Sequence, residues 1–115
     1  MIAVIFEVEA KPDHREDYLA LAAALKGDLE RMDGFISVER FESLTNPGKL
    51  LSLSFWRDEH AIRSWRDLTA HRAAQRMGRN RFFAGYRLRV AGVLRDYGLD
   101  DRAEAPADSR AAHGE

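Results

Sequence analysis

Residues 2–9 (I-A-V-I-F-E-V-E) constrain the fold most, because this β-branched segment is apolar on two sides. Successive side chains of a strand point to opposite faces. The even-numbered positions are all apolar: Ile2, Val4, Phe6 and Val8. The other face begins with Ala3 and Ile5 before it reaches Glu7. We therefore expect a strand that is covered on both faces.

A helix is predicted next, from about residue 14 to residue 32. Its apolar stripe recurs at helical spacing: Tyr18, Ala22, Leu25, Leu29 and Met32. Asp13 followed by Glu16 has the form of a capping box at the start of this helix. Asp33-Gly34 supplies a C-terminal stop.

The remaining chain predicts two more strands, a helix and a last strand. Residues 35–42 alternate as a half-buried strand, and Asn46-Pro47-Gly48 marks the turn into a strand over residues 50–56. Asp58 is expected to cap a second helix, whose stripe passes Ala61, Trp65 and Leu68 and extends through His71 and Gln75 toward Gly78. Residues 86–97 alternate again as the last strand.

This order of elements, β-α-β-β-α-β, predicts the ferredoxin-like class of α+β fold. Both helices then cover one face of a four-stranded antiparallel sheet, and no helix is left for the other face. Because the first strand is apolar on both sides, we expect the second face to pair with another copy of the chain. Residues 1–97 form the predicted domain. Residues 98–115 have few large apolar side chains, so we expect a flexible C-terminal tail.

Composition narrows the functional classes. The chain of 115 residues has no cysteine, which excludes disulfides, thiolate metal sites and thiol nucleophiles. Its formal net charge of -1 gives no general attraction to polyanions or membranes. The N-terminus lacks the features of a signal peptide, and no apolar run approaches the roughly 20 residues that span a bilayer. We expect a cytoplasmic protein that binds neither nucleic acid nor membrane.

Candidate chemistry centres on His71, because it lies on the predicted apolar stripe six residues after Trp65 and histidine titrates near neutral pH. The alternative is a histidine that is merely satisfied by a backbone hydrogen bond. No metal site is predicted, since no histidines stand four residues apart and no acidic cluster has ligand spacing. Aromatic residues that would line a pocket are Trp56, Trp65, Phe82, Phe83 and Tyr86, and they serve equally well as plain core.

Arginines are concentrated between residues 57 and 95. Arg87 and Arg89 share one face of the last predicted strand. They would either meet an anionic substrate or pair with Glu7 and Glu39 across the sheet, and we expect pairing.

Four segments together resemble the antibiotic biosynthesis monooxygenase family. They are G-F-x-x-x-E-R-F (34–41), L-S-F-W-R-D-E-x-A-I-x-x-W (53–65), H-R-x-x-Q-x-x-G-R (71–79) and Y-R-x-R-V (86–90). The resemblance covers roughly residues 1–97. It implies a dimeric α/β barrel in which two ferredoxin-like sheets pack face to face, as the first strand suggests independently. Some members oxygenate aromatic substrates without metal or flavin, and others bind and degrade haem.

The haem-degrading branch fits this sequence poorly. Its pattern has an asparagine on the first strand, a tryptophan on the second helix and a haem-ligating histidine ten residues later. Trp65 matches the tryptophan, but Gln75 stands at the ligand position and Phe6 and Glu7 occupy the first strand. His71, one turn earlier, would be the substitute ligand.

The cofactor-free branch is contradicted less, so it gives the functional hypothesis. The resemblance implies that Trp65 stacks on a small aromatic or phenolic substrate and that His71 accepts its hydroxyl proton. Arg81, or alternatively Arg87, would stabilise the developing oxyanion. The remaining predicted substrate contacts are Phe6, Trp56, Phe83 and Tyr86. We predict a homodimer without cofactor. A haem-binding protein and a non-catalytic small-molecule-binding dimer are the alternatives.

Overall fold

The computed structural model describes the backbone of residues 1–76 and 83–112 and the side chains of residues 1–68 and 84–110. The elements follow in the order β1 (Ile2–Ala10), the 3₁₀ turn η1 (Pro12–His14), α1 (Arg15–Glu30), β2 (Phe35–Glu42), β3 (Lys49–Trp56), α2 (Glu59–Arg76), β4 (Phe83–Gly92) and α3 (Ala107–Ala112).

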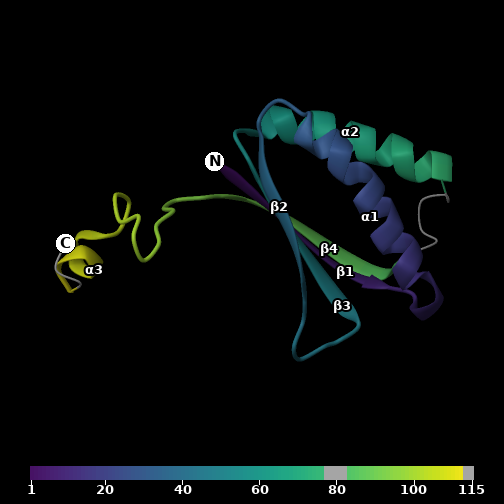
Figure 1. The fold of residues 1–115 in the computed structure, drawn as a ribbon, viewed down its shortest axis with the longest axis horizontal. Helices are drawn as coiled ribbons and strands as arrows, with labels where there is room; N and C mark the ends of the chain where they lie inside the picture. The colour runs from purple at the N-terminus through teal and green to yellow at the C-terminus, as the bar shows by residue number, and fades with distance from the viewer. Residues whose placement is uncertain (77–82, 113–115) are drawn as a thin grey trace.

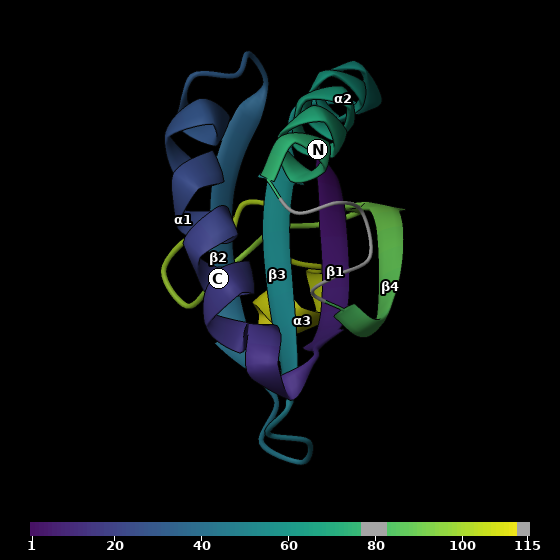
Figure 2. The same ribbon diagram turned by 90° about the vertical axis from the view of Figure 1, so that its right-hand side faces the viewer.

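The strands form one antiparallel sheet in the order β2-β3-β1-β4. Helices α1 and α2 lie side by side on a single face of this sheet (Figures 1 and 2). The predicted ferredoxin-like α+β fold is therefore confirmed. Strand β1 lies inside the sheet, between β3 and β4. It is the segment whose two apolar faces predicted a strand that is covered on both sides.

The core lies between the helices and the even-numbered side chains of β1. Val8 packs with residues of α1 and with Leu50, whereas Val4 packs with Leu29, Trp56 and the start of α2. Trp56 and Val8 have no solvent-exposed surface. These two clusters are joined by Trp65, which packs against both of them.

The helix ends test three local predictions. Asp58 caps α2, because its Oδ1 accepts a hydrogen bond of 3.0 Å from the backbone N–H of Ala61. Gly34 lies in the loop between α1 and β2, directly before β2 begins. Its φ of 88° is a backbone conformation that favours glycine. The capping box at Asp13 is wrong: α1 has His14 as its N-cap and no side-chain cap, since the chain first forms η1.

The last strand is displaced from its predicted range of 86–97. It begins at Phe83 and ends at Gly92, which lies opposite Ile2. Phe83 lies opposite Ala10, after a register shift between Glu9 and Ala10. Residues 93–97 alternate in sequence, but β1 has only Met1 left beside them, and Val93 N–H bonds to the Met1 carbonyl at 3.0 Å. A strand without a partner cannot continue.

After Gly92 the chain forms an arm that leaves the sheet on the side opposite the two helices (Figure 1). The arm ends in α3, which the sequence analysis did not expect. Arg102 organises it by donating a hydrogen bond of 2.9 Å to the Ser109 hydroxyl and by lying 5.1 Å from the ring centroid of Tyr97. The flexibility of residues 98–115 stays a prediction. None of the described helices has the length and apolarity to cross a membrane.

Candidate functional site

A cavity of about 230 Å³ lies between the sheet and the two helices. Every strand and both helices contribute to its lining: Val4, Phe6, Tyr18, Leu21, Ala22, Leu25, Arg40, Ser52, Ser54, Trp65 and Leu88. Most of these side chains are apolar, and the polar ones are few. A concavity of this kind is typical of a small-molecule site.

The floor of the cavity is one row of side chains that crosses the whole sheet. Arg40 on β2 pairs with Ser52 on β3, Ser52 with Phe6 on β1, and Phe6 with Leu88 on β4. Because paired residues point to the same face of an antiparallel sheet, all four face the helices. The floor is therefore polar over β2 and β3 and apolar over β1 and β4.

The roof comes from the apolar stripe of α1 and from Trp65 on α2. Trp65 is half-buried and rests on Trp56, with ring centroids 6.1 Å apart. Trp56 is in turn held by an edge contact with Phe35 and by a hydrogen bond of 2.9 Å from its Nε1 to the Ser54 hydroxyl. Trp65, which lines the cavity, is thus supported by Trp56 in the core.

Arg40 and Tyr18 dominate the electrostatics of the cavity. Burial raises the pKa of the Tyr18 phenol, while the hydrogen bond and positive charge of Arg40 oppose that rise. Tyr18 is therefore a neutral phenol at neutral pH. Arg40 is half-buried, its Nε is fully shielded from solvent, and this atom has no hydrogen-bond partner. A buried donor that stays unsatisfied costs about 1–3 kcal/mol.

The predicted site residues are only partly brought together. Phe6 and Trp65 both line the cavity. Trp56 lies instead in the core, where it supports Trp65 without lining the cavity. Tyr86 is 64% exposed, with its ring centroid 5.7 Å from that of Phe6. The side chains of four further candidates lie outside the described residues: His71, Arg81, Phe82 and Phe83.

Sequence reasoning missed the polar members of the site. Arg40 stands in the quoted segment G-F-x-x-x-E-R-F, where it received no role, and Tyr18 was assigned only to the apolar stripe of α1. The available signal was alternation in β3, in which Ser52 and Ser54 occupy the same face as the buried Leu50 and Trp56. Two serines on the buried face of a strand indicate a polar hollow.

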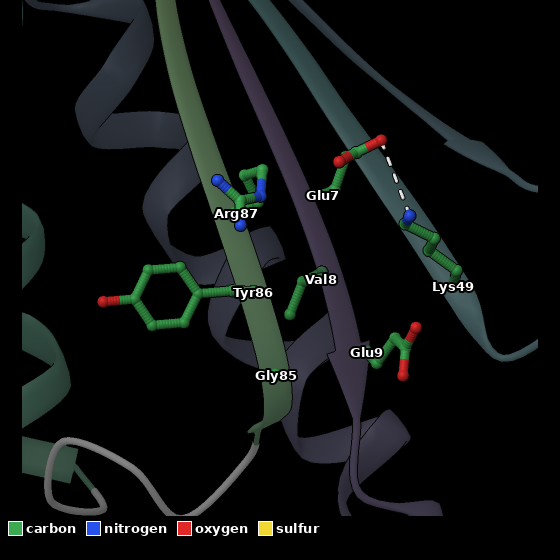
Figure 3. Close-up of a pocket in the computed structure, with 7 residues that line it drawn as sticks. All are labelled: Glu7, Val8, Glu9, Lys49, Gly85, Tyr86 and Arg87. Atoms are coloured by element: carbon green, nitrogen blue, oxygen red, sulfur yellow. Dashed lines mark ion pairs between the residues drawn. The ribbon is translucent and has the colours of Figure 1, made fainter.

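A second hollow, of about 220 Å³, lies at the far end of β1 and is polar (Figure 3). Glu7 pairs there with Lys49 at 3.6 Å and, on the open face, with Arg89 at 2.9 Å. The pairing of Arg89 with Glu7 is the one we expected. The hydrogen bond from Arg89 keeps the pKa of Glu7 below its ordinary value. Tyr86 points away from Glu7 and Lys49 (Figure 3). This hollow and the apolar cavity share no lining residue, so they are distinct.

The fold and the cavity define a ferredoxin-like α+β protein with an apolar hollow under its helices. Residues 1–77 match the family model described as antibiotic biosynthesis monooxygenase, and the chain belongs to that family. The chain is 45% identical over 93 residues to a jasmonate monooxygenase ABM of Pyricularia oryzae. That match covers 81% of this chain but 43% of the relative, so the chain spans less than half of the relative's length.

Solved structures share the fold. Rv0793 from Mycobacterium tuberculosis superposes with a TM-score of 0.72 at 23% identity, covering 84% of this chain and 98% of that chain. A mutant of MhuD with two manganese protoporphyrin IX molecules bound per active site superposes with a TM-score of 0.68 at 17% identity, covering 85% of this chain and 99% of that chain. At these identities the likeness establishes the fold alone.

The described lining of the cavity offers no ligand to haem iron, and the side chains of the candidate ligand positions, His71 and Gln75, lie outside the described residues. The volume of about 230 Å³ falls below the roughly 300–1,000 Å³ of sites for drug-sized ligands. Among the described lining residues, the side chains with polar atoms are Tyr18, Arg40, the two serines and Trp65. An arginine is no metal ligand, and the raised pKa of Tyr18 disfavours the phenolate that would bind iron. The described part of the chain also holds no cluster of three metal-ligating side chains.

Proposed function

We propose that this chain is a monooxygenase domain that oxidises a small, largely apolar or aromatic molecule with dioxygen and without a resident metal or flavin. The cavity between Trp65 and the sheet carries the proposal, because it is apolar, enclosed on its roof by two helices, and sized for a small organic molecule. Family membership supports the class of reaction. The jasmonate monooxygenase of Pyricularia oryzae supports a small organic substrate.

For the phenolic substrate that the sequence suggests, the substrate itself supplies the electrons. Loss of the hydroxyl proton gives an electron-rich anion that reduces dioxygen at a ring carbon. One oxygen atom stays on that carbon as a second carbonyl, and the other leaves as water. The ring is oxidised to a quinone, so the reaction balances without an external reductant.

The described residues supply binding and exclusion of water. Trp65 offers a flat apolar surface above the floor residues Phe6 and Leu88. Aromatic rings contribute both apolar area and stacking. His71 as the base and Arg81 as the oxyanion partner stay predictions from the sequence, since their side chains lie outside the described residues.

Oxygen labelling tests the proposal. Protein free of haem and flavin would be incubated under ¹⁸O₂ with hydroquinone, 1-naphthol and jasmonate, each with and without an added reductant. We expect one ¹⁸O atom in the product of at least one substrate. If oxygen uptake stays at the background rate with every substrate, the non-catalytic binding dimer becomes the better description. A haemin titration run in parallel should give no stoichiometric Soret shift.

We also propose that the open face of the sheet packs against a second copy of the chain. This face carries apolar side chains that the helices do not cover: Ile5, Phe41, Leu51, Leu53 and Phe55. The charge of Glu7, which lies among them, is met by Arg89 and Lys49. A sheet face with this many uncovered apolar side chains is suited to association. The C-terminal arm also leaves on this side (Figure 1).

A further inference from the structure

Arg40 presents hydrogen-bond donors that the protein does not use. A guanidinium has five N–H donors in a planar fork. One interaction goes to the Tyr18 side chain. The Nε–H is shielded from solvent and has no partner. Among the described residues no carboxylate forms an ion pair with Arg40, whereas Arg15, Arg57 and Arg89 all have one.

We propose that Arg40 binds a carboxylate of the substrate, so that the cavity selects small organic carboxylic acids with an apolar body. This inference rests on the proposed function only in taking the cavity as the substrate site. A carboxylate has two oxygens in a plane and matches the guanidinium fork in a bidentate pair. Arg40 is the one cation among the described lining residues, so the site fits a single negative charge better than a phosphate dianion.

The floor of the cavity orients such a ligand. Its polar end lies over β2 and β3, where Arg40 and Ser52 are paired neighbours, and its apolar end lies over β1 and β4, at Phe6 and Leu88. A carboxylate at the β2 end leaves the apolar body beneath Trp65, and the Ser52 hydroxyl lies beside the head group. The polar end of the floor thus matches the carboxylate of an organic acid, and the apolar end matches its hydrocarbon body.

Tyr18 acts as a positioning residue in this arrangement. Its phenol lines the cavity beside Arg40 and interacts with the guanidinium, and its ring packs in the core cluster of α1 with Val8 and Leu50. The ring is anchored by burial, so the contact restricts the rotamers of the long arginine side chain. A cation that is held in place before the ligand arrives loses less conformational entropy on binding.

Binding of an acid and of its neutral ester separates the charge contact from apolar packing. The probes are phenylacetate with methyl phenylacetate and cyclopentylacetate with its methyl ester, measured by calorimetry under nitrogen so that no oxidation occurs. We expect the wild-type protein to bind each acid at least about tenfold more tightly than its ester. Arg40→Gln should remove this preference by weakening binding of the acid far more than binding of the ester. Arg40→Lys should keep part of it, because the charge remains and the fork is lost.

Arg63→Gln is the matched control, because Arg63 is exposed on α2 and does not line the cavity. It should leave both affinities unchanged. Equal affinities for acid and ester in the wild-type protein would overturn the inference, whether or not the Arg40 variants fold. A preference that persists in folded Arg40→Gln would do the same. Acid binding without any oxygenation would refute the proposed function alone, and oxygenation by a wild-type protein that binds acid and ester equally well would refute this inference alone.

Discussion

Trp65 packs on Trp56 with ring centroids 6.1 Å apart and an interplanar angle of 33°, so the wall of the cavity rests directly on the core. Only Trp56 is fully buried, whereas Trp65 retains some exposed surface. Because the two neighbours differ in burial, we expect Trp56 to serve stability and Trp65 to serve binding of the proposed substrate.

Alanine at each position separates these roles. Trp56→Ala removes a fully buried side chain and should lower the free energy of unfolding by about 3–5 kcal/mol. Trp65→Ala should cost less, because Trp65 is only half-buried, and should weaken binding of methyl phenylacetate while the protein stays folded. Urea denaturation and calorimetry measure the two effects. Equal losses of stability in both variants would contradict this assignment.

Two glycines should respond to alanine with opposite signs. Gly34 has a φ of 88°, and a Cβ placed there would lie 2.7 Å from the Cβ of Ala61. Gly34→Ala should therefore destabilise the protein by roughly 1–3 kcal/mol. Gly27 lies inside α1 with no atom closer than 3.9 Å to an added Cβ. Gly27→Ala should stabilise by roughly 0.4–1 kcal/mol, and the two variants control for each other in urea denaturation.

Acid should weaken the ion pairs that join the loop after α1 to the start of α2. Arg57 donates to both carboxylate oxygens of Asp33 at 3.0 Å and to Asp58 at 2.9 Å. Hydrogen bonds from Arg57 lower the pKa of Asp33. The backbone N–H of Ala61, followed by Arg57, lowers the pKa of Asp58. Because both carboxyls have a lower pKa in the folded state, their stabilisation is complete above the ordinary value of about 4 and is lost as the pH falls through the lowered values.

Urea midpoints should accordingly stay level from neutral pH to about pH 5 and fall below about pH 4. Arg57→Gln should reduce the part of this fall that comes from Asp33 and Asp58, while Arg63→Gln should leave the profile unchanged. The pairs are exposed, so added salt should also reduce the effect. A profile that Arg57→Gln does not alter would show that other carboxyls control the acid transition.

The sequence predicted the elements well because their signals are local. Alternation in β1 and β2 and the helical spacing in α1 depend on neighbours a few positions away, and so does the cap at Asp58. The range of β4 was not predictable in this way, because its ends depend on where β1 offers a partner, from Ala10 to Ile2.

The site was less predictable than the fold. Trp65 and Phe6, which the sequence predicts as substrate contacts, both line the cavity, since aromatic residues on predicted elements are visible in the sequence. Arg40 was not assigned to the cavity. A register shift between Phe35 and Ser37 interrupts the alternation of β2, so simple alternation from Phe35 does not predict that Arg40 faces the helices. Its proximity to Tyr18 is a tertiary contact between residues that are far apart in the chain.

His71→Ala tests the base that the sequence predicts. If His71 accepts the substrate proton, this variant should lower kcat for a phenolic substrate by about 10²–10⁴-fold and leave binding of methyl phenylacetate unchanged. His60→Ala is the control, because His60 is exposed near the start of α2. Turnover that survives in His71→Ala at the wild-type rate would remove His71 from the mechanism, and an equal loss in His60→Ala would point to a general effect on the helix.

Leu53→Arg should disrupt the proposed dimer. Leu53 lies on the open face of β3, between Ile5 of β1 and Glu39 of β2, where the helices do not reach it. An arginine there would lose its hydration on association, and pairing with Glu39 on the neighbouring strand would offset only part of this cost, so association should become less favourable by several kcal/mol. Light scattering should show a dimer for the wild-type protein and a folded monomer for the variant. Ser37→Arg at the sheet edge, on the same face but opposite Phe55, should weaken the dimer less. A wild-type protein that is monomeric at all concentrations would overturn the proposed dimer.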